Sequence, residues 1–385
     1  MSDNANTGPL AGIRVVDLTT ARSGPTCARQ LVDFGADAIH IGAPGRAELS
    51  GSDGWNLRRG TRSIGLDLRK PSHFDVLLRL IDRADVLVEN FRPSVKYRLG
   101  LAPEEVLTRN PLLVYASISG FGEDGPYAER PGLDQITQGL SGIMSVTGPP
   151  DSGPWRTGIA ISDTASGTFL TQGILAALFA RERTGKGQWV RTSLLETMVN
   201  FMDFQAVRYL NEGDVPRSTG NDHPTLVPMG AYKTSDGMVN IAVISGFDRF
   251  CAVIGAEELL SDPRFVDQAL RTANRDDLAA EVAKRLRQQP TAHWVDALNA
   301  ADLPCGPVLS IDEMFADPQV GHLRMVVDVP HPSGNGNVHV LRHPVTMSGT
   351  ATSVRGGPPV LGAHMDEVLA ELGLSDAELA VFRSS

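Results

Sequence analysis

The sequence predicts an α/β fold in which a parallel sheet carries helices on both faces. Short apolar runs alternate with amphipathic segments of helical period over the first 120 residues. Strands and helices that alternate in this way form parallel βαβ units. Ligands of such sheets bind beyond the carboxyl ends of the strands. Here those ends are the loops at 19–25, 42–50, 89–98 and 119–131.

Local signals place the elements of this first part. A helix is expected at 25–34, because Pro25 suits the first turn of a helix and Gly35 suits its end. A second helix is expected at 72–84, where apolar residues recur with the helical period. Strands are expected at the apolar runs 12–18, 36–41, 85–90 and 112–119.

The remaining chain predicts a long helix and then a smaller unit. The long helix is expected at 164–183, because an apolar stripe runs along it and glycines follow at 185 and 187. The hairpin and helices in the middle of the chain predict an α+β unit. In order, we expect a helix at 193–211, a linker at 211–230, a hairpin at 232–244 with its turn at Asp236-Gly237, helices at 276–289 and 291–301, and a helix near 364–382.

Composition narrows the functional classes. The chain has 385 residues, enough for two or three domains, and a formal net charge of −10. An acidic chain binds nucleic acid poorly, so no nucleic-acid partner is expected. The three cysteines, Cys27, Cys251 and Cys305, lie far apart and predict neither a disulfide framework nor a metal site. The polar N-terminus and the absence of a long apolar stretch predict a cytoplasmic protein with no membrane partner.

Residues 120–125 (GFGEDG) match a dinucleotide-binding pattern and follow a predicted strand. Their context argues against that function, since Glu123 and Asp124 would face a pyrophosphate. Pro126 and Pro131 also stand where the phosphate-binding helix should begin. We therefore expect a glycine-rich loop that reverses the chain, and an NAD-dependent oxidoreductase would rest on this loop alone.

Asp163 lies between the apolar segment GIAIS and the helix expected from Thr164. One interpretation is a helix N-cap, for which Asp is a preferred residue. The other is a nucleophilic carboxylate. The unpaired amides of the helix N-terminus would keep it ionised and could stabilise a nearby oxyanion. Spacing alone favours the cap, although the two roles are compatible.

Two polar loops are candidate binding segments. Residues 89–93 (ENFRP), followed by Lys96 and Arg98, come after a strand. Basic residues there suit phosphate groups, and arginine can stack on an adenine ring. Residues 66–69 (LDLR) are a weaker candidate. In both cases the alternative is an ordinary solvated loop or strand end.

Eight segments, taken in order, resemble one family. They are LAGIRVVDLTTARSGP (10–25), TRSIGLDLRKP (61–71), DVLVENFRPSVKYRLGL (85–101), YASISGFGEDGPY (115–127), GLDQITQGLSGIM (132–144), ISDTASGTFLTQGILAALFARERTGKGQWV (161–190), LPCGPVLSIDEMFADPQV (303–320) and PPVLGAHMDEVLAELGL (358–374). With them the chain resembles the class III CoA-transferase family, which includes formyl-CoA and carnitine CoA-transferases. Their order makes the resemblance specific. The resemblance favours the nucleophilic carboxylate over the helix cap as the interpretation of Asp163.

The resemblance implies a fold and an activity. The fold would be a Rossmann-like large domain, 1–222 with 306–385, and a small α+β domain, 223–305, in a homodimer of interlocked chains. The activity would be CoA transfer from an acyl-CoA donor to a small carboxylic acid, with coenzyme A as substrate and no permanently bound cofactor. Asp163 would attack the donor thioester, giving an anhydride and then an aspartyl-CoA thioester.

The sequence departs from the family pattern at two places. Gly42-Ala43 replace a glutamate that is common in the family, and residues 221–231 lack the glycine run of formyl-CoA transferases. A formate or oxalate substrate is therefore not indicated.

Carried over by position, the resemblance also implies which residues contact CoA. The expected CoA contacts are Ala21, Arg22, Leu66, Asp67, Leu68, Arg69, Asn90, Phe91, Arg92, Arg98 and Arg130.

Two rival functions stay open. A 2-methylacyl-CoA racemase of the same fold needs a proton acceptor and a proton donor on opposite faces of the α-carbon. Related racemases place a histidine before an aspartate where this chain has Leu133-Asp134, and their second acid falls on Phe247. Neither Leu133 nor Phe247 transfers protons, which favours CoA transfer. The other rival is a non-catalytic CoA-binding protein, against which the presence of Asp163 in its motif argues.

Overall fold

In the computed structural model, which describes residues 8–45 and 49–384, the larger part of the chain surrounds a parallel sheet. Its strands are β1 (Arg14–Asp17), β2 (Asp37–Gly42), β3 (Arg62–Gly65), β4 (Val86–Glu89), β5 (Val114–Ser119) and β6 (Gln188–Ser193). They pair in parallel in the order β3-β2-β1-β4-β5-β6, which confirms the predicted sheet. In sheets of this order the chain leaves β1 and β4 in opposite directions, and a crevice opens between their carboxyl ends.

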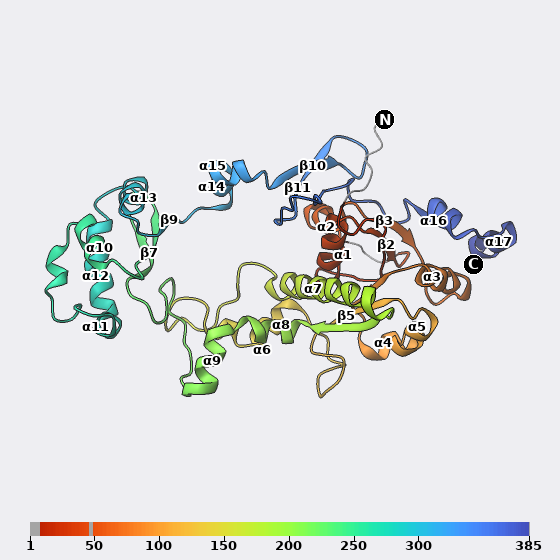
Figure 1. Cartoon of the computed structure of the whole chain (residues 1–385), viewed down its shortest axis with the longest axis horizontal. Helices are drawn as coiled ribbons and strands as arrows, with labels where there is room; N and C mark the ends of the chain where they lie inside the picture. The colour runs from red at the N-terminus through yellow and green to blue at the C-terminus, as the bar shows by residue number, and fades with distance from the viewer. Residues whose placement is uncertain (1–7, 46–48, 385) are drawn as a thin grey trace. The chain divides into compact units, whose positions relative to one another are not determined.

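Helices cover both faces of the sheet (Figure 1). One face carries α1 (Ser23–Asp33) and α7 (Ile161–Thr184), and the other carries α3 (Pro71–Asp82), α5 (Pro103–Arg109), α16 (Met365–Leu372) and α17 (Asp376–Ser384). Val15 and Val16 of β1 join different cores, because successive strand side chains point to opposite faces. The other elements of this part are α2 (Gly51–Arg58), α4 (Pro93–Arg98), α6 (Asp134–Leu140), α8 (Leu194–Phe201), β10 (Val326–Pro330) and β11 (Asn337–Leu341). Two further elements, η1 (Ile143–Ser145) and α9 (Asp203–Glu212), each begin in this part and end in the second one.

The chain divides into two compact units. The first takes the described residues up to Ile143, Thr157–Val207 and those from Arg324 onward, so both ends of the chain build it. The second takes Met144–Arg156 and Arg208–Leu323, and it extends beyond 223–305 on both sides. One reason is that the amide of Gly220 donates to the carbonyl of Gly148 at 3.0 Å, which ties the two segments of this unit together.

The second unit has its own antiparallel sheet and its own apolar core. Phe250, Phe265 and Trp294 are among the side chains buried in that core. The elements are β7 (Met229–Lys233), β8 (Met238–Ala242), β9 (Cys305–Pro307), α10 (Phe247–Val253), η2 (Glu257–Leu260), α11 (Gln268–Ala273), α12 (Arg275–Leu286), α13 (Thr291–Ala300), α14 (Ile311–Ala316) and α15 (Pro318–Leu323). The predicted hairpin and the two predicted helices of this region are therefore confirmed.

Some predicted element boundaries were wrong. α7 begins at Ile161 rather than Thr164, and Ala160 is its N-cap, so Asp163 lies inside the first turn and is not a cap. The helix predicted at 193–211 is the pair α8 and α9, and the break comes at Asp203, the first residue of α9, which takes φ 41°. The helix predicted near 364–382 likewise breaks at Gly373, which takes φ 68°. Across the described residues, no helix is long and apolar enough to span a membrane.

α1 and α7 lie side by side (Figure 1), and Gly167 of α7 is in close contact with the first turn of α1. A Cβ atom on Gly167 would lie 2.5 Å from the carbonyl oxygen of Ser23 and 2.8 Å from the Cβ of Thr26. Ser23 is the first residue of α1, and Gly167 lies one turn after Asp163 in α7. The absence of a side chain at Gly167 therefore brings the N-terminus of α1 next to Asp163.

Gly167→Ala is expected to lower the free energy of unfolding by about 1–3 kcal/mol, because the added Cβ meets backbone that must shift. Urea unfolding followed by circular dichroism measures the change. The control is Gly349→Ala, where a Cβ meets nothing within 4 Å, and a change below about 0.5 kcal/mol is expected. Equal effects of the two substitutions would contradict the close approach of the helices.

Candidate active site

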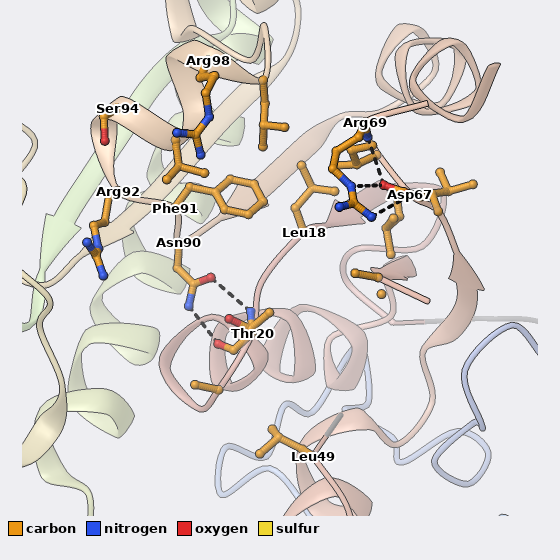
Figure 2. Close-up of a pocket in the computed structure, with 18 of the residues that line it drawn as sticks. Leu18, Thr20, Leu49, Asp67, Arg69, Asn90, Phe91, Arg92, Ser94 and Arg98 are labelled. Atoms are coloured by element: carbon orange, nitrogen blue, oxygen red, sulfur yellow. Dashed lines mark hydrogen bonds and ion pairs between the residues drawn. The ribbon is translucent and has the colours of Figure 1, made fainter. Parts of the chain in front are cut away.

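A cavity of about 940 Å³ opens at the carboxyl ends of the strands, where the loops after β1 and β4 diverge. Figure 2 shows Phe91 and Arg98 on one side of this cavity and Arg69 with Asp67 on the other. Gly42 and Ala43 also line the wall, but they contribute no charge. The structure thus brings together nine of the expected CoA contacts: Ala21, Leu66, Asp67, Leu68, Arg69, Asn90, Phe91, Arg92 and Arg98.

Hydrogen bonds fix the two central loops of the cavity. The side chain of Asn90 accepts from the Thr20 amide at 3.1 Å and donates to the Thr20 carbonyl at 2.8 Å (Figure 2). Across the cavity, Arg69 Nε donates to Asp67 Oδ1 at 2.8 Å, and this hydrogen bond lowers the pKa of Asp67. Arg92 and Arg98 are exposed, so their charges are accessible to an anionic ligand.

A buried ion pair supports the loop after β1. Arg58 Nη1 donates to Asp17 Oδ2 at 2.5 Å, and Arg58 Nη2 donates to the carbonyl of Thr19 at 2.8 Å. Burial alone would raise the pKa of Asp17, but the charge of Arg58 and hydrogen bonds from His40 and Thr19 lower it below its usual range. The pair therefore holds the loop whose next residues, Thr20 and Ala21, line the cavity.

Lys96 does not face the cavity, contrary to its expected role beside phosphate groups. Its side chain is fully buried, and Nζ donates to Glu89 Oε1 at 2.6 Å and to Glu123 Oε2 at 2.8 Å. Burial raises the pKa of Glu89, and Lys96 acts against that rise. Glu89 Oε2 also accepts from the amide of Phe91 at 2.8 Å. Lys96 thus ties the end of β4 to the loop that contains Glu123.

The glycine-rich segment 120–125 is a loop that reverses the chain, as predicted. No helix follows it before α6, and Gly122 takes φ 113°. The chain comes back on itself before α6, because a Cβ on Gly120 would lie 2.7 Å from the Cα of Gly132. Arg130 lies between this loop and α6, outside the cavity, and stacks on the ring of Tyr127, 3.6 Å from its centroid.

Asp163 lies half-buried in the first turn of α7 and does not line the cavity. Among the described residues, no group donates a hydrogen bond to its carboxylate. Burial and the nearby charge of Asp134 raise the pKa of Asp163 to about 6, and Arg22 acts against that rise. The pKa of Asp163 therefore lies above that of an ordinary aspartate, and its carboxylate is ionised only above about pH 6.

Asp134 supplies the N-terminal cap that α7 lacks in its own sequence. Its Oδ1 accepts from the amide of Ser162 at 3.0 Å and from the Ser162 hydroxyl at 2.9 Å, and its Oδ2 accepts from Gln138 Nε2 at 2.8 Å. This contact explains why the helix begins before Asp163. No local sequence pattern predicts this contact, because Asp134 and Ser162 are 28 positions apart.

Arg22 is also outside the cavity, although Ala21 lines it. Ala21 takes φ 60°, a left-handed conformation that is uncommon for alanine and turns the chain into α1. Arg22 is the N-cap residue of α1, and its Nη2 donates to Asp53 Oδ2 of α2 at 2.6 Å.

In the part of the chain that the structure describes, no group of acidic, His and Cys side chains could hold a metal ion.

Comparisons with known proteins place the chain in one family. The model of CoA-transferase family III matches residues 10–365. The acetyl-CoA:oxalate CoA-transferase of Acetobacter aceti is 39% identical and aligns over 89% of this chain and 90% of its own length. The succinate–glutarate CoA-transferase of Agrobacterium fabrum is 35% identical over 94% and 96%, respectively. A crystal structure of a CAIB/BAIF family protein from Brucella suis has a TM-score of 0.84 at 35% identity, over 95% and 100%.

The chain belongs to CoA-transferase family III. It is an enzyme that transfers CoA from an acyl-CoA to a carboxylic acid, and CoA thioesters are its substrates. This identification excludes the non-catalytic CoA-binding protein as an alternative.

Asp163→Asn is expected to raise the free energy of unfolding at pH 7.5 by about 1–2 kcal/mol. Folding raises the pKa of Asp163 from 3.8 to about 6, so the folded state loses stability as pH rises through this interval. The substitution removes this loss of stability. The gain in the free energy of unfolding should therefore disappear near pH 3.5. Urea unfolding at several pH values measures it.

Asp236→Asn is the control of opposite sign. Hydrogen bonds from the amide and hydroxyl of Thr291 lower the pKa of Asp236, so its carboxylate stabilises the fold at neutral pH. This substitution should therefore destabilise the protein at pH 7.5. If Asp163→Asn gave no more stability at pH 7.5 than at pH 3.5, the raised pKa of Asp163 would be disproved.

Proposed function

We propose that the transfer runs through Asp163 and that the cavity at β1 and β4 binds the CoA. The observation that carries this proposal is the state of the Asp163 carboxylate. It is half-buried, receives no hydrogen bond within the described residues, and has a pKa of about 6. Near neutral pH such a carboxylate is ionised but poorly stabilised, and it is therefore a better nucleophile than a solvated one.

The proposed reaction proceeds by four acyl exchanges. The Asp163 carboxylate attacks the carbonyl of the donor thioester, and the C–S bond breaks to release CoA thiolate and leave a mixed anhydride. The thiolate attacks the Asp163 acyl carbon, which releases the donor acid as its carboxylate and forms the aspartyl-CoA thioester. The acceptor carboxylate then attacks that thioester and releases the thiolate again. The thiolate takes the acceptor acyl group, which restores the Asp163 carboxylate.

The cavity suits the nucleotide end of CoA. Arg92 and Arg98 offer charges for its phosphate groups, and Phe91 and Arg69 present faces on which adenine can stack. We also propose that Arg130 contacts CoA as a more distant cation, because it lies outside the cavity. No permanently bound cofactor is part of the proposal, because the reaction needs only acyl exchange.

We further propose that the enzyme works as a cytoplasmic homodimer of interlocked chains. Apolar side chains of the second unit stay exposed in a single chain. Two of them belong to α14, namely Ile311, which is 76% exposed, and Phe315, which is 43% exposed. A second copy would bury them. Size-exclusion chromatography with light scattering tests this state.

The racemase alternative receives no support from the site. Leu133, where related racemases have histidine, is 65% exposed and carries no proton. The Asp134 carboxylate accepts hydrogen bonds from Ser162 and Gln138 on both oxygens, which suits a structural role. Oxalate, succinate, glutarate and mesaconate occur in the names of the relatives, and they are the first acids to test.

Incubation with an acyl-CoA followed by borohydride or hydroxylamine is expected to modify Asp163, because both reagents attack its anhydride and thioester. Peptide mass spectrometry identifies the modified residue. The yield of modification should rise with pH around 6, where the carboxylate ionises. Asp163→Ala should show no adduct and lose at least about 10³-fold in kcat.

Asp151→Ala, at an exposed aspartate, is the matched control and should react like the unaltered enzyme. Undiminished turnover in Asp163→Ala, or an adduct on another residue, would refute the assignment. Deuterium exchange at the substrate α-carbon without any acceptor acid would indicate a racemase instead.

A further inference from the structure

Arg22 lies beside the nucleophile rather than in the CoA cavity. It immediately precedes Ser23, whose carbonyl contacts α7 at Gly167, one turn of about 5.4 Å from Asp163. Its guanidinium nevertheless forms no ion pair with Asp163 among the described residues and is bound to Asp53 instead. The cation is therefore near Asp163 but displaced from it, on the side of α2.

The bond between Arg22 and Asp53 is easily exchanged. The Arg22 side chain is 32% exposed and that of Asp53 is 60% exposed. Ion pairs of such exposure contribute little to stability, about 0–1 kcal/mol. Arginine presents a planar fork that matches any carboxylate, so a substrate carboxylate can take the place of Asp53 without a large cost.

The position of Arg22 decides which carboxylate it would hold. A reacting carboxylate must come within about 3–3.5 Å of the acyl carbon on Asp163. A carboxylate bound to Arg22 lies farther away, because no guanidinium nitrogen is within ion-pair distance of Asp163. It would therefore belong to the other end of the same acid. Two other charged groups near this point are Arg29, which is half-buried and interacts with Asp33, and Asp134, which repels anions.

We propose that Arg22 binds the non-reacting carboxylate of the acid substrate, which makes this enzyme specific for short dicarboxylic acids, and that Asp53 holds the guanidinium in place until the acid arrives. The inference rests on the proposed function of Asp163. It assigns to Arg22 a role in acid recognition rather than the CoA contact expected from the sequence.

The test compares succinate with butyrate as acceptors of CoA from acetyl-CoA, since butyrate replaces one carboxylate by a methyl group at equal length. The unaltered enzyme should prefer succinate by about 10- to 100-fold in kcat/KM, the effect of one charge-assisted pair. Arg22→Gln should reduce this ratio at least tenfold. Arg22→Lys should keep part of it, because the charge remains but the planar fork is lost.

Two further variants sharpen the result. Arg109→Gln breaks an arginine–aspartate pair of similar exposure, with Asp82, far from Asp163 in the sequence, and should leave the ratio unchanged. Asp53→Asn frees the guanidinium and should lower the KM for succinate a few-fold. Calorimetric binding of CoA to Arg22→Gln should match that of the unaltered enzyme.

Three outcomes would overturn the inference. They are equal use of succinate and butyrate by the unaltered enzyme, an unchanged ratio in Arg22→Gln, and a large loss of CoA affinity in that variant. Borohydride trapping at Asp163 in the unaltered enzyme separates this inference from the proposed function. If trapping fails, the proposed function fails, and calorimetric binding of succinate to the unaltered and Arg22→Gln proteins still decides the role of Arg22.

Discussion

The rest of the site depends on two carboxylates, Asp163 and Asp134, that the fold holds close together. Asp134 receives three hydrogen bonds from Ser162 and Gln138, and Asp163 receives none from the described residues. Hydrogen bonds from protein donors thus go to Asp134, and the cost of burial stays with Asp163. Burial and like charge both disfavour the ionised form of Asp163. In the proposed mechanism, this destabilisation of the ionised form favours attack of the carboxylate on an acyl group.

Gly167 allows this arrangement, because it lets α1 reach the first turns of α7. Arg22 arrives by the same approach, and it partly offsets the negative charge around Asp163. Farther along the sheet, the buried pairs of Arg58 with Asp17 and of Lys96 with Glu89 hold the loops that line the cavity. The loop that runs from β1 into α1 therefore borders the cavity at Ala21 and leads to the contact of α1 with α7, one turn from Asp163.

The sequence predicted the sheet because its signals are local. Apolar runs such as 36–41 and the periodicity of 72–84 depend on neighbouring residues only, and β2 and α3 formed where expected. The first turn of α7 was missed because its cap, Asp134, comes from another helix. Lys96 was misassigned for a similar reason, since its partner Glu123 lies in a loop 27 residues away. The raised pKa of Asp163 also depends on tertiary neighbours, so no sequence pattern announced it.

The most direct test of this account is a titration of the Asp163 carboxyl group itself. NMR of enzyme with isotopically labelled aspartate carboxyl carbons, assigned by comparison with Asp163→Asn, reports its ionisation at each pH. The account predicts a midpoint near pH 6, about two units above an ordinary aspartate, and a lower midpoint in Asp134→Asn. A midpoint near pH 4 in the unaltered enzyme would contradict it.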